Sequence, residues 1–478
     1  MATILSIDIG TSRVKTALID ENGTLLQLQS QRIDRTRSPD TQSAEEWYLS
    51  AVSCMKHLQE PEPDLIALTG NMHALLGIDK DGKPTADAEL WCSNTAGAES
   101  DFLMQHYGSR ILSRTGNPVT PVFTLPKLLR MKKRYPERYQ RTVCFLQVKD
   151  YIAYRLCGNL LTDPSDASGT LLYRLDTGSW DSELAGELGI DLQKFPEILP
   201  SAAICGHLTA QASRETGLRS GIPIVIGSGD LASAAAGAGT DQNTLSLTLG
   251  TAGQLLAVGT RGKYPLLKGK LFVFAHADPS KELYLGSVPG GGFSFEWLAN
   301  NMLNCSLDEF FSLALNSRLS SGDLPLFLPY LLGRGAPYMD YIPNAQWLGL
   351  SADHKREDLA AAAVFGVLSA LRQSCDLLAE LPDHKADTIM LQSLAKREES
   401  VRNAACDLFV QPCKKIPVNP EASLLGAAII GTIATKIHAD FSTAYKKMIQ
   451  VQELSPSSPD RKENAREYYR RYSAASQL

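Results

Sequence analysis

The pattern of apolar and polar residues at the start of the chain predicts a strand meander. Three short runs rich in apolar residues lie at 4–8, 14–19 and 25–33, and such runs are typical of strands. Asn22-Gly23 separates the second run from the third, and Asn-Gly is a strong hairpin signal. Farther along, the wider spacing of apolar residues predicts helices at 44–58, 125–133 and 150–155.

A second region, residues 221–260, repeats the opening pattern. A short apolar run leads to Gly229-Asp230, and the next apolar run ends in Gly250-Thr251. This second pair aligns with Gly10-Thr11 at an offset of 240 residues. An internal repeat at this spacing predicts two homologous lobes rather than a solenoid. We assign these lobes to residues 1–240 and 241–478.

The C-terminal half has mainly helical patterns, with helices expected at 357–381, 423–437 and 464–476. The uncharged apolar run at 422–434 is too short to cross a bilayer.

A net charge of −5 disfavours nucleic acid and anionic membranes as partners. The first residues have no basic region, so no signal peptide is expected. Nine scattered cysteines without a Cys-x-x-Cys pair favour a reducing cytoplasm.

The two Gly-Thr turns are candidates for holding phosphate. Glycine lets the backbone turn tightly and approach a ligand, and exposed amides and hydroxyls can bind phosphate oxygens. Asp8, at the end of the first strand, could hold Mg²⁺ through water, because Mg²⁺ gives up its hydration reluctantly. The alternative is a plain hairpin turn in which Asp8 caps its own backbone. The residues assigned to phosphate are Gly10, Thr11, Ser12, Gly250 and Thr251.

Asp230 follows an apolar strand and opens a predicted helix. Aspartate is among the best N-cap residues, so a purely structural role is one interpretation. A carboxylate beside a phosphate-binding turn could instead act as a general base that removes a proton from a hydroxyl during phosphoryl transfer. The chain has no GxxxxGK[ST] motif, so a P-loop kinase is not indicated.

A predicted strand at 65–68 ends in a group of residues that could contact a sugar. Asn71, Met72 and His73 offer an amide, a thioether and an imidazole. A lone histidine is more often a structural hydrogen bonder, however. Trp91 could provide an aromatic face for a sugar ring or belong to the core.

Taken together, these segments resemble the FGGY carbohydrate kinases, and most nearly the xylulokinases, over almost the whole chain. Asp8-Ile-Gly-Thr-Ser12 resembles the opening phosphate motif of the family, and Gly229-Asp230 resembles its catalytic segment. The other similar segments are 70–73, 122–129, 149–151, 163–170, 249–251, Pro337 with 344–345 and 349–351, and 421–428.

The resemblance implies an α/β fold of two ribonuclease-H-like lobes, as in actin-like ATPases, that close on a sugar and ATP. It implies Asp230 as the base, Asp8 close to Mg²⁺, and Met72 and His73 at the sugar. The N-terminal lobe would then bind the sugar, and the C-terminal lobe the nucleotide. A small sugar or polyol is the expected partner, and a homodimer is left open as the assembly.

The chain also departs from the family pattern at several positions. Leu231 stands where xylulokinases have asparagine, and the segment 91–95 lacks the usual aspartate and arginine. Gln392 and Ser393 replace the Gly-Gly pair of the adenosine site. From Leu231 and the altered segment 91–95 we expect a preferred substrate other than D-xylulose, and from Gln392 and Ser393 we expect relaxed nucleotide selection.

Two other functional classes are compatible with the sequence. One is a catalytically impaired sugar-binding regulator derived from a sugar kinase, which the altered segments favour. The other is a chaperone or filament-forming ATPase of the same superfold, which the extended match outside the phosphate turns disfavours.

Overall fold

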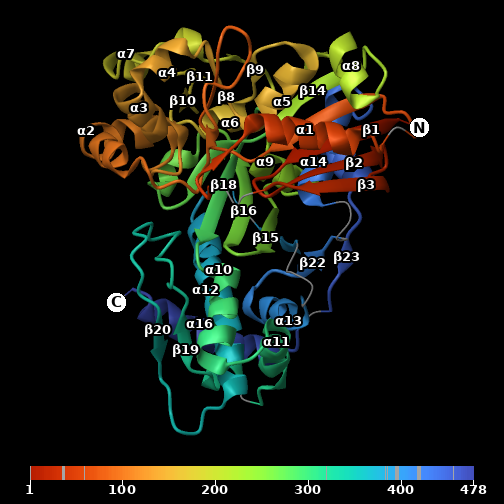
Figure 1. Ribbon diagram of the computed structural model, residues 1–478. Helices are drawn as coiled ribbons and strands as arrows, with labels where there is room; N and C mark the ends of the chain where they lie inside the picture. The colour runs from red at the N-terminus through yellow and green to blue at the C-terminus, as the bar shows by residue number, and fades with distance from the viewer. Residues whose placement is uncertain are drawn as a thin grey trace.

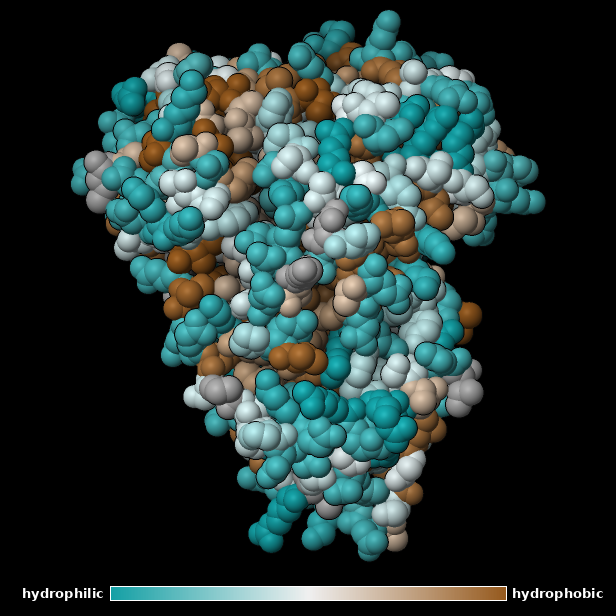
Figure 2. Space-filling view, turned by 180° about the vertical axis from the view of Figure 1, so that it is seen from behind, coloured by the Kyte–Doolittle hydropathy of each residue, from teal (hydrophilic) through white to brown (hydrophobic). Residues whose placement is uncertain are grey.

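The computed structural model describes residues 2–34, 38–58, 60–318, 320–382, 384, 386–392, 398–416, 421–455 and 457–477. These residues build two large β-sheets with helices packed around them (Figure 1). The strand order is β13-β14-β5-β1-β2-β3 in the first sheet and β17-β18-β16-β15-β21-β22-β23 in the second. Seen from behind, the surface is mainly hydrophilic, and the molecule narrows toward its lower end (Figure 2).

The first sheet joins an antiparallel meander to two parallel strands. β1, β2 and β3 are antiparallel neighbours, β5 is parallel to β1, and β14 is parallel to β5. The expected meander is therefore confirmed. The strands of this sheet are β1 (Thr3–Ile9), β2 (Arg13–Asp20), β3 (Leu25–Arg32), β5 (Leu65–Gly70), β13 (Ile204–His207) and β14 (Pro223–Gly229).

The second sheet repeats this arrangement, as the internal repeat predicts. β15 and β16 form an antiparallel hairpin, β18 is antiparallel to β16, and β21 and β22 continue parallel to β15. The two Gly-Thr turns thus occupy the same hairpin position in both sheets. The strands are β15 (Thr244–Leu249), β16 (Gly253–Thr260), β17 (Phe272–Ala275), β18 (Lys281–Val288), β21 (Thr388–Leu391), β22 (Cys413–Lys415) and β23 (Gln452–Glu453).

Helices from distant parts of the chain cover the two faces of the first sheet. One face packs against α1 (Ala44–Met55), α5 (Val148–Cys157) and α8 (Ala210–Thr216). The other packs against α14 (Ala422–Ala434) and α15 (Phe441–Met448), although these helices lie late in the sequence. The division into lobes at residue 240 stays a prediction.

The contact between α9 (Asp230–Gly237) and α14 depends on glycine. A Cβ atom built on Gly237 would collide with the Ala422 carbonyl, and one built on Gly426 would collide with the Ser233 carbonyl. The two backbones can therefore approach only where both residues lack a side chain. This close packing fixes α14 beside the helix that carries Asp230 (Figure 1).

The second sheet packs on a long helix, α12 (Arg356–Ala379). By length and composition α12 is the one described helix that could cross a membrane, but 83% of its most apolar stretch is buried, as in a core helix.

α16 begins before the predicted residue 464, because the Ser458 hydroxyl caps it and Pro459 suits the first helical position. The neighbouring helices are α10 (Gly291–Leu298), α11 (Leu307–Asn316), α13 (Glu398–Leu408) and α16 (Pro459–Ala475).

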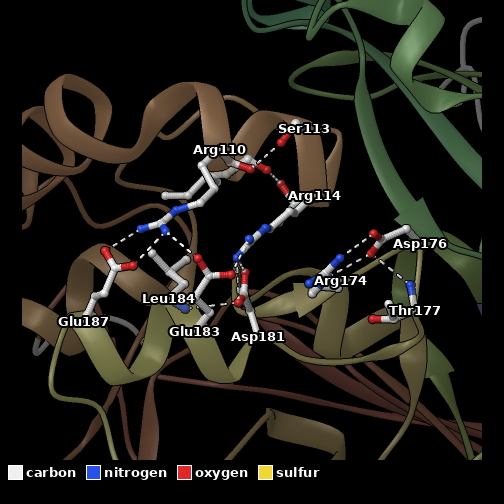
Figure 3. A network of polar contacts seen from close by, with 12 residues as sticks. Arg110, Ser113, Arg114, Arg174, Asp176, Thr177, Asp181, Glu183, Leu184 and Glu187 are labelled. Carbon is white, nitrogen blue, oxygen red and sulfur yellow. Dashed lines mark hydrogen bonds and ion pairs between the residues drawn. The ribbon is translucent and has the colours of Figure 1, made fainter.

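A further group of helices flanks the first sheet. A polar network joins α2 (Gly97–Thr115) to both ends of α7 (Ser182–Glu187). Arg114 contacts Asp181, the N-cap of α7, at 2.9 Å, Arg110 contacts Glu187 at 2.6 Å, and Glu183 contacts both arginines (Figure 3). The helices are α2 (Gly97–Thr115), α3 (Thr124–Arg134), α4 (Pro136–Arg141), α6 (Pro164–Ser168) and α7 (Ser182–Glu187). Short strand pairs connect them, namely β4 (Thr41–Gln42) with β7 (Ala88–Glu89), β6 (Leu76–Ile78) with β8 (Cys144–Leu146), β9 (Leu161–Thr162) with β12 (Glu197–Ile198), and β10 (Tyr173–Arg174) with β11 (Ser179–Trp180). β19 (Leu326–Leu328) pairs with β20 (Gln346–Leu348) beside α12.

Candidate active site between the two sheets

A cleft of about 570 Å³ lies between the two sheets and brings together residues from both ends of the chain. The first repeat contributes Asp8 and Gly10, and the start of α9 contributes Asp230 and Leu231. The cations that line the cleft are Lys15 from β2, Arg402 from α13 and Lys415 from β22. With Glu421, which also lines the cleft, the structure gathers three acidic groups, three basic groups and a glycine turn around one space.

Asp8 lies at the end of β1 and is almost completely buried, with 8% of its surface exposed. Its carboxylate accepts a hydrogen bond of 2.7 Å from the Ser423 hydroxyl at the start of α14. Burial raises the pKa of Asp8, while the Ser423 hydrogen bond and the nearby Lys15 act in the opposite direction. Lys15 also forms an ion pair with Glu421. Sequence reasoning missed Ser423, whose only signal was its place in a segment similar to a family motif.

Asp230 is the first residue of α9, directly after β14, and is partly buried. Burial, followed by the neighbouring charge of Asp8, raises the pKa of Asp230 to about 7. The backbone amides of Asp230 and Leu231 bind the carboxylate and limit this rise. A carboxylate with a pKa near neutrality can take up a proton during a reaction and release it again. The N-cap position itself belongs to Gly229, so the simple capping interpretation of Asp230 does not hold.

The first turn is a tight hairpin in which the Gly10 amide donates to the Arg13 carbonyl at 3.0 Å. Thr11 is partly buried and Ser12 is exposed. The indole N–H of Trp91 donates to the Thr11 hydroxyl at 3.1 Å, and the Trp91 side chain is 45% exposed. Trp91 therefore lies against the first Gly-Thr turn and not in the core. Its contact with a sugar stays a prediction.

The second turn rests on the start of α10. The amides of Gly292 and Phe293 donate to the carbonyls of Gly250 and Thr251, both at 3.0 Å. Gly250 and Thr251 are exposed at the end of β15. These bonds hold the turn backbone in place, while both residues remain exposed to solvent.

The predicted sugar residues follow β5. The Asn71 side-chain amide donates to the Ile9 carbonyl at 2.9 Å, so it holds the end of β1. Met72 is buried beside Gly229, where an added Cβ would lie 2.7 Å from the methionine sulfur. The structure thus brings Met72 next to the residue that precedes Asp230.

His73 is buried with a positive φ of 68°. Its Nδ1 lies 3.0 Å from the Gly169 carbonyl, which can only accept, so Nδ1 carries the proton and Nε2 is an acceptor. Burial lowers the pKa of His73 to about 4, and the ring packs against Phe123 and Phe274. A neutral imidazole in apolar surroundings can accept a hydrogen bond from a hydroxyl.

Of the two residues predicted for the adenosine site, Gln392 lines the cleft. Its side-chain amide contacts Ser246 and lies 3.4 Å from the Ala234 carbonyl. Ser393 lies outside the described residues.

These groups fit a nucleoside triphosphate with Mg²⁺. The turns offer amides and hydroxyls, and the cations complement phosphate charge. Among the described residues no three acidic, cysteine or histidine side chains are grouped as metal ligands. Mg²⁺ usually keeps several waters and binds through one or two carboxylates plus substrate phosphates, and the carboxylates of Asp8 and Asp230 both line the cleft.

Comparison with known proteins agrees with this geometry. The family models for the FGGY family of carbohydrate kinases match residues 3–237 with the N-terminal domain and residues 247–435 with the C-terminal domain. The xylulose kinase of Staphylococcus xylosus is 31% identical over 391 residues, which is 79% of this chain and 80% of that protein. The gluconokinase of Bacillus licheniformis is 25% identical and covers 97% of this chain and 93% of its own length.

Solved structures show the same fold. Ligand-bound xylulose kinase from Lactobacillus acidophilus has a TM-score of 0.91 at 22% identity, and the match covers 100% of this chain and 98% of that one. The expected two-lobed, actin-like α/β fold is therefore confirmed. Because the two family models together span most of its length, the chain belongs to the FGGY family of carbohydrate kinases.

Proposed function

We propose that this protein transfers the terminal phosphoryl group of MgATP to a hydroxyl of a small sugar or polyol. The observation that carries the proposal is Asp230, a carboxylate with a pKa raised to about 7 in a cleft shared with Asp8 and a glycine turn. Relatives named xylulose kinase and gluconokinase support a sugar as the acceptor. We infer a cytoplasmic location, and homodimer formation stays a prediction.

In this proposal, Asp230 accepts the proton of the attacking hydroxyl. MgATP supplies the phosphoryl group and, through its metal ion, neutralises part of the phosphate charge. Asp8 would hold the metal through water, and the two turns would bind phosphate oxygens. Lys15 lines the same cleft beside Asp8, where it can stabilise negative charge.

The residues beside Asp230 favour a substrate that forms few hydrogen bonds through its hydroxyl groups. Leu231 lines the cleft directly after the base and cannot form a hydrogen bond through its side chain. A buried sugar hydroxyl left unpaired there typically costs about 1–3 kcal/mol. The Nε2 atom of His73 can still accept from one hydroxyl. We propose a ketose other than D-xylulose, or a polyol, as the preferred acceptor.

ADP release with Mg²⁺ and ATP, measured across D-xylulose, D- and L-ribulose, sedoheptulose, erythritol and glycerol, tests both parts of this proposal. We expect one of these acceptors to exceed D-xylulose in kcat/KM. Leu231→Asn should raise activity on D-xylulose relative to the best substrate, because asparagine restores a donor and an acceptor. A lead of about tenfold for D-xylulose, equal to about 1.4 kcal/mol, would contradict the substrate assignment. Sugar binding without ADP release would instead favour the impaired regulator.

The pKa of Asp230 predicts an acid limb in the pH profile. The ionised carboxylate is the form that can accept a proton, so kcat should rise with pH and level off above about 7. Below that value kcat should fall about tenfold per pH unit. The measurement is kcat at saturating substrates between pH 5 and 9, with circular dichroism as a control for folding. A flat profile between pH 5 and 7 would show that Asp230 is not the base.

A further inference from the structure

The end of β14 is irregular just before Asp230. Its pairing with β5 shifts register between Val225 and Ser228, and Gly227 has a positive φ of 67°. The backbone N–H of Gly229, the last residue of the strand, donates to a side chain, the Ser165 hydroxyl, at 2.8 Å. Ser165 lies in the short helix α6, which is distant in sequence. Gly229 caps α9 without a side chain, so the Ser165 hydroxyl is a direct tether for the start of this helix.

Ser165 is itself held by a buried acid. Its hydroxyl donates to Asp163 Oδ2 at 2.6 Å, and the Ser201 hydroxyl donates to the same oxygen at 2.7 Å. The other oxygen of Asp163 lies 3.0 Å from Lys149 Nζ. Lys149, Asp163 and Ser165 are fully buried, and Ser201 is 1% exposed. Since the Ser165 proton is committed to Asp163, the hydroxyl presents its lone pairs to the Gly229 N–H.

The charge on Lys149 is maintained by its surroundings. Burial acts against it, but the carboxylates of Asp150, Asp163 and Asp166 together raise the pKa of Lys149 well above its ordinary value. The cost of removing two charges from water offsets much of the stability that a buried ion pair contributes, but the pair holds its partners in one geometry. The cluster therefore gives Asp163 a fixed position from which it orients Ser165.

We propose that Ser165 is a positioning residue for Asp230, acting through the Gly229 amide. The proposal rests on the proposed role of Asp230 as the base. A general base must lie within hydrogen-bond reach of the proton that it accepts, and a displacement of about 1 Å can lower a rate about 100-fold. Without the Ser165 hydroxyl, a buried N–H loses its acceptor and the first turn of α9 becomes free to shift.

Ser165→Ala and Ser201→Ala form a matched pair that tests this role. Each variant removes one hydroxyl donor from Asp163 Oδ2, but only Ser165→Ala also removes the acceptor of the Gly229 amide. We expect Ser165→Ala to lower kcat about tenfold or more, with KM for both substrates changed by less than about threefold. Its acid limb should move to lower pH, because a less confined carboxylate is better hydrated. Ser201→Ala should keep the parent kcat and pH profile, and Ser165→Thr should recover much of the lost kcat.

Equal losses of kcat in the two alanine variants, or a parent kcat and pH profile in Ser165→Ala, would overturn the proposal. If Ser165→Ala does not fold, Ser165→Cys keeps the side-chain shape but offers only a weak acceptor, and the same results are expected. If Asp230→Ala is fully active, the base assignment fails rather than the tether. Hydrogen exchange tests the hydrogen bond between Ser165 and the Gly229 amide independently of activity. The peptide spanning 223–237 should exchange faster in Ser165→Ala than in Ser201→Ala, and equal rates would exclude it.

Discussion

Replacement of Asp230 by alanine should lower kcat by about 10²- to 10⁴-fold, the usual contribution of a general base. The reason is that a sugar hydroxyl is a poor nucleophile unless a nearby group accepts its proton. Asp230 has the required pKa, raised to about 7 by burial and by the charge of Asp8. The measurement is ADP release at saturating sugar and MgATP, with sugar binding followed by calorimetry. Turnover close to that of the parent would contradict the assignment.

Asp230→Asn is the control that separates chemistry from folding. Asparagine keeps the shape of the side chain but cannot serve as the base, so the loss of kcat should resemble that of the alanine variant. The raised pKa means that burial disfavours the ionised carboxylate in the folded protein. Any stability cost of this charge is therefore largest above pH 7 and absent at low pH. We expect Asp230→Asn to melt no lower than the parent at pH 8. A much lower melting temperature would indicate a structural role.

Replacement of Asp8 by alanine should lower turnover by about 10- to 100-fold. This range is typical for the loss of a group that holds a metal indirectly, here through water. The Mg²⁺ concentration required for half-maximal activity should rise, while sugar affinity should change little. The measurement is a Mg²⁺ titration of kcat together with a sugar-binding isotherm. Loss of sugar affinity with an unchanged Mg²⁺ titration would assign Asp8 to a different site.

Two further variants refine the role of Asp8. Ser423→Ala removes the hydroxyl that donates to Asp8 but leaves the carboxylate, so its effect on turnover should be smaller than that of Asp8→Ala. Asp8→Asn removes the neighbouring charge that raises the pKa of Asp230. The acid limb of the remaining activity should therefore move to lower pH. A limb shifted to higher pH would show that the two carboxylates do not interact as described.

Local patterns in the sequence were sufficient to predict the strands and turns that carry the site. The apolar runs before Asp8 and Asp230 specify buried strands, and glycine after the strand specifies a tight turn, because these preferences depend on neighbouring residues alone. The Gly-Thr repeat likewise predicted the second hairpin, since a repeated local pattern folds into a repeated unit. The carboxylates and turns of the site were therefore accessible from the sequence.

Only the tertiary structure decided which of these groups meet and how they are held. Ser423 reaches Asp8 across 415 positions in the chain, and Ser165 reaches Gly229 across 64. No local pattern reports such contacts, because they follow from the packing of α14 and α6 against the first sheet. The raised pKa of Asp230 has the same origin. Asp230 becomes buried and comes close to the charge of Asp8 only when β1 and β14 pair with the two sides of β5. The sequence thus determined which chemical groups were available, and long-range packing determined their environment, because solvent exclusion and charge proximity are properties of the assembled fold.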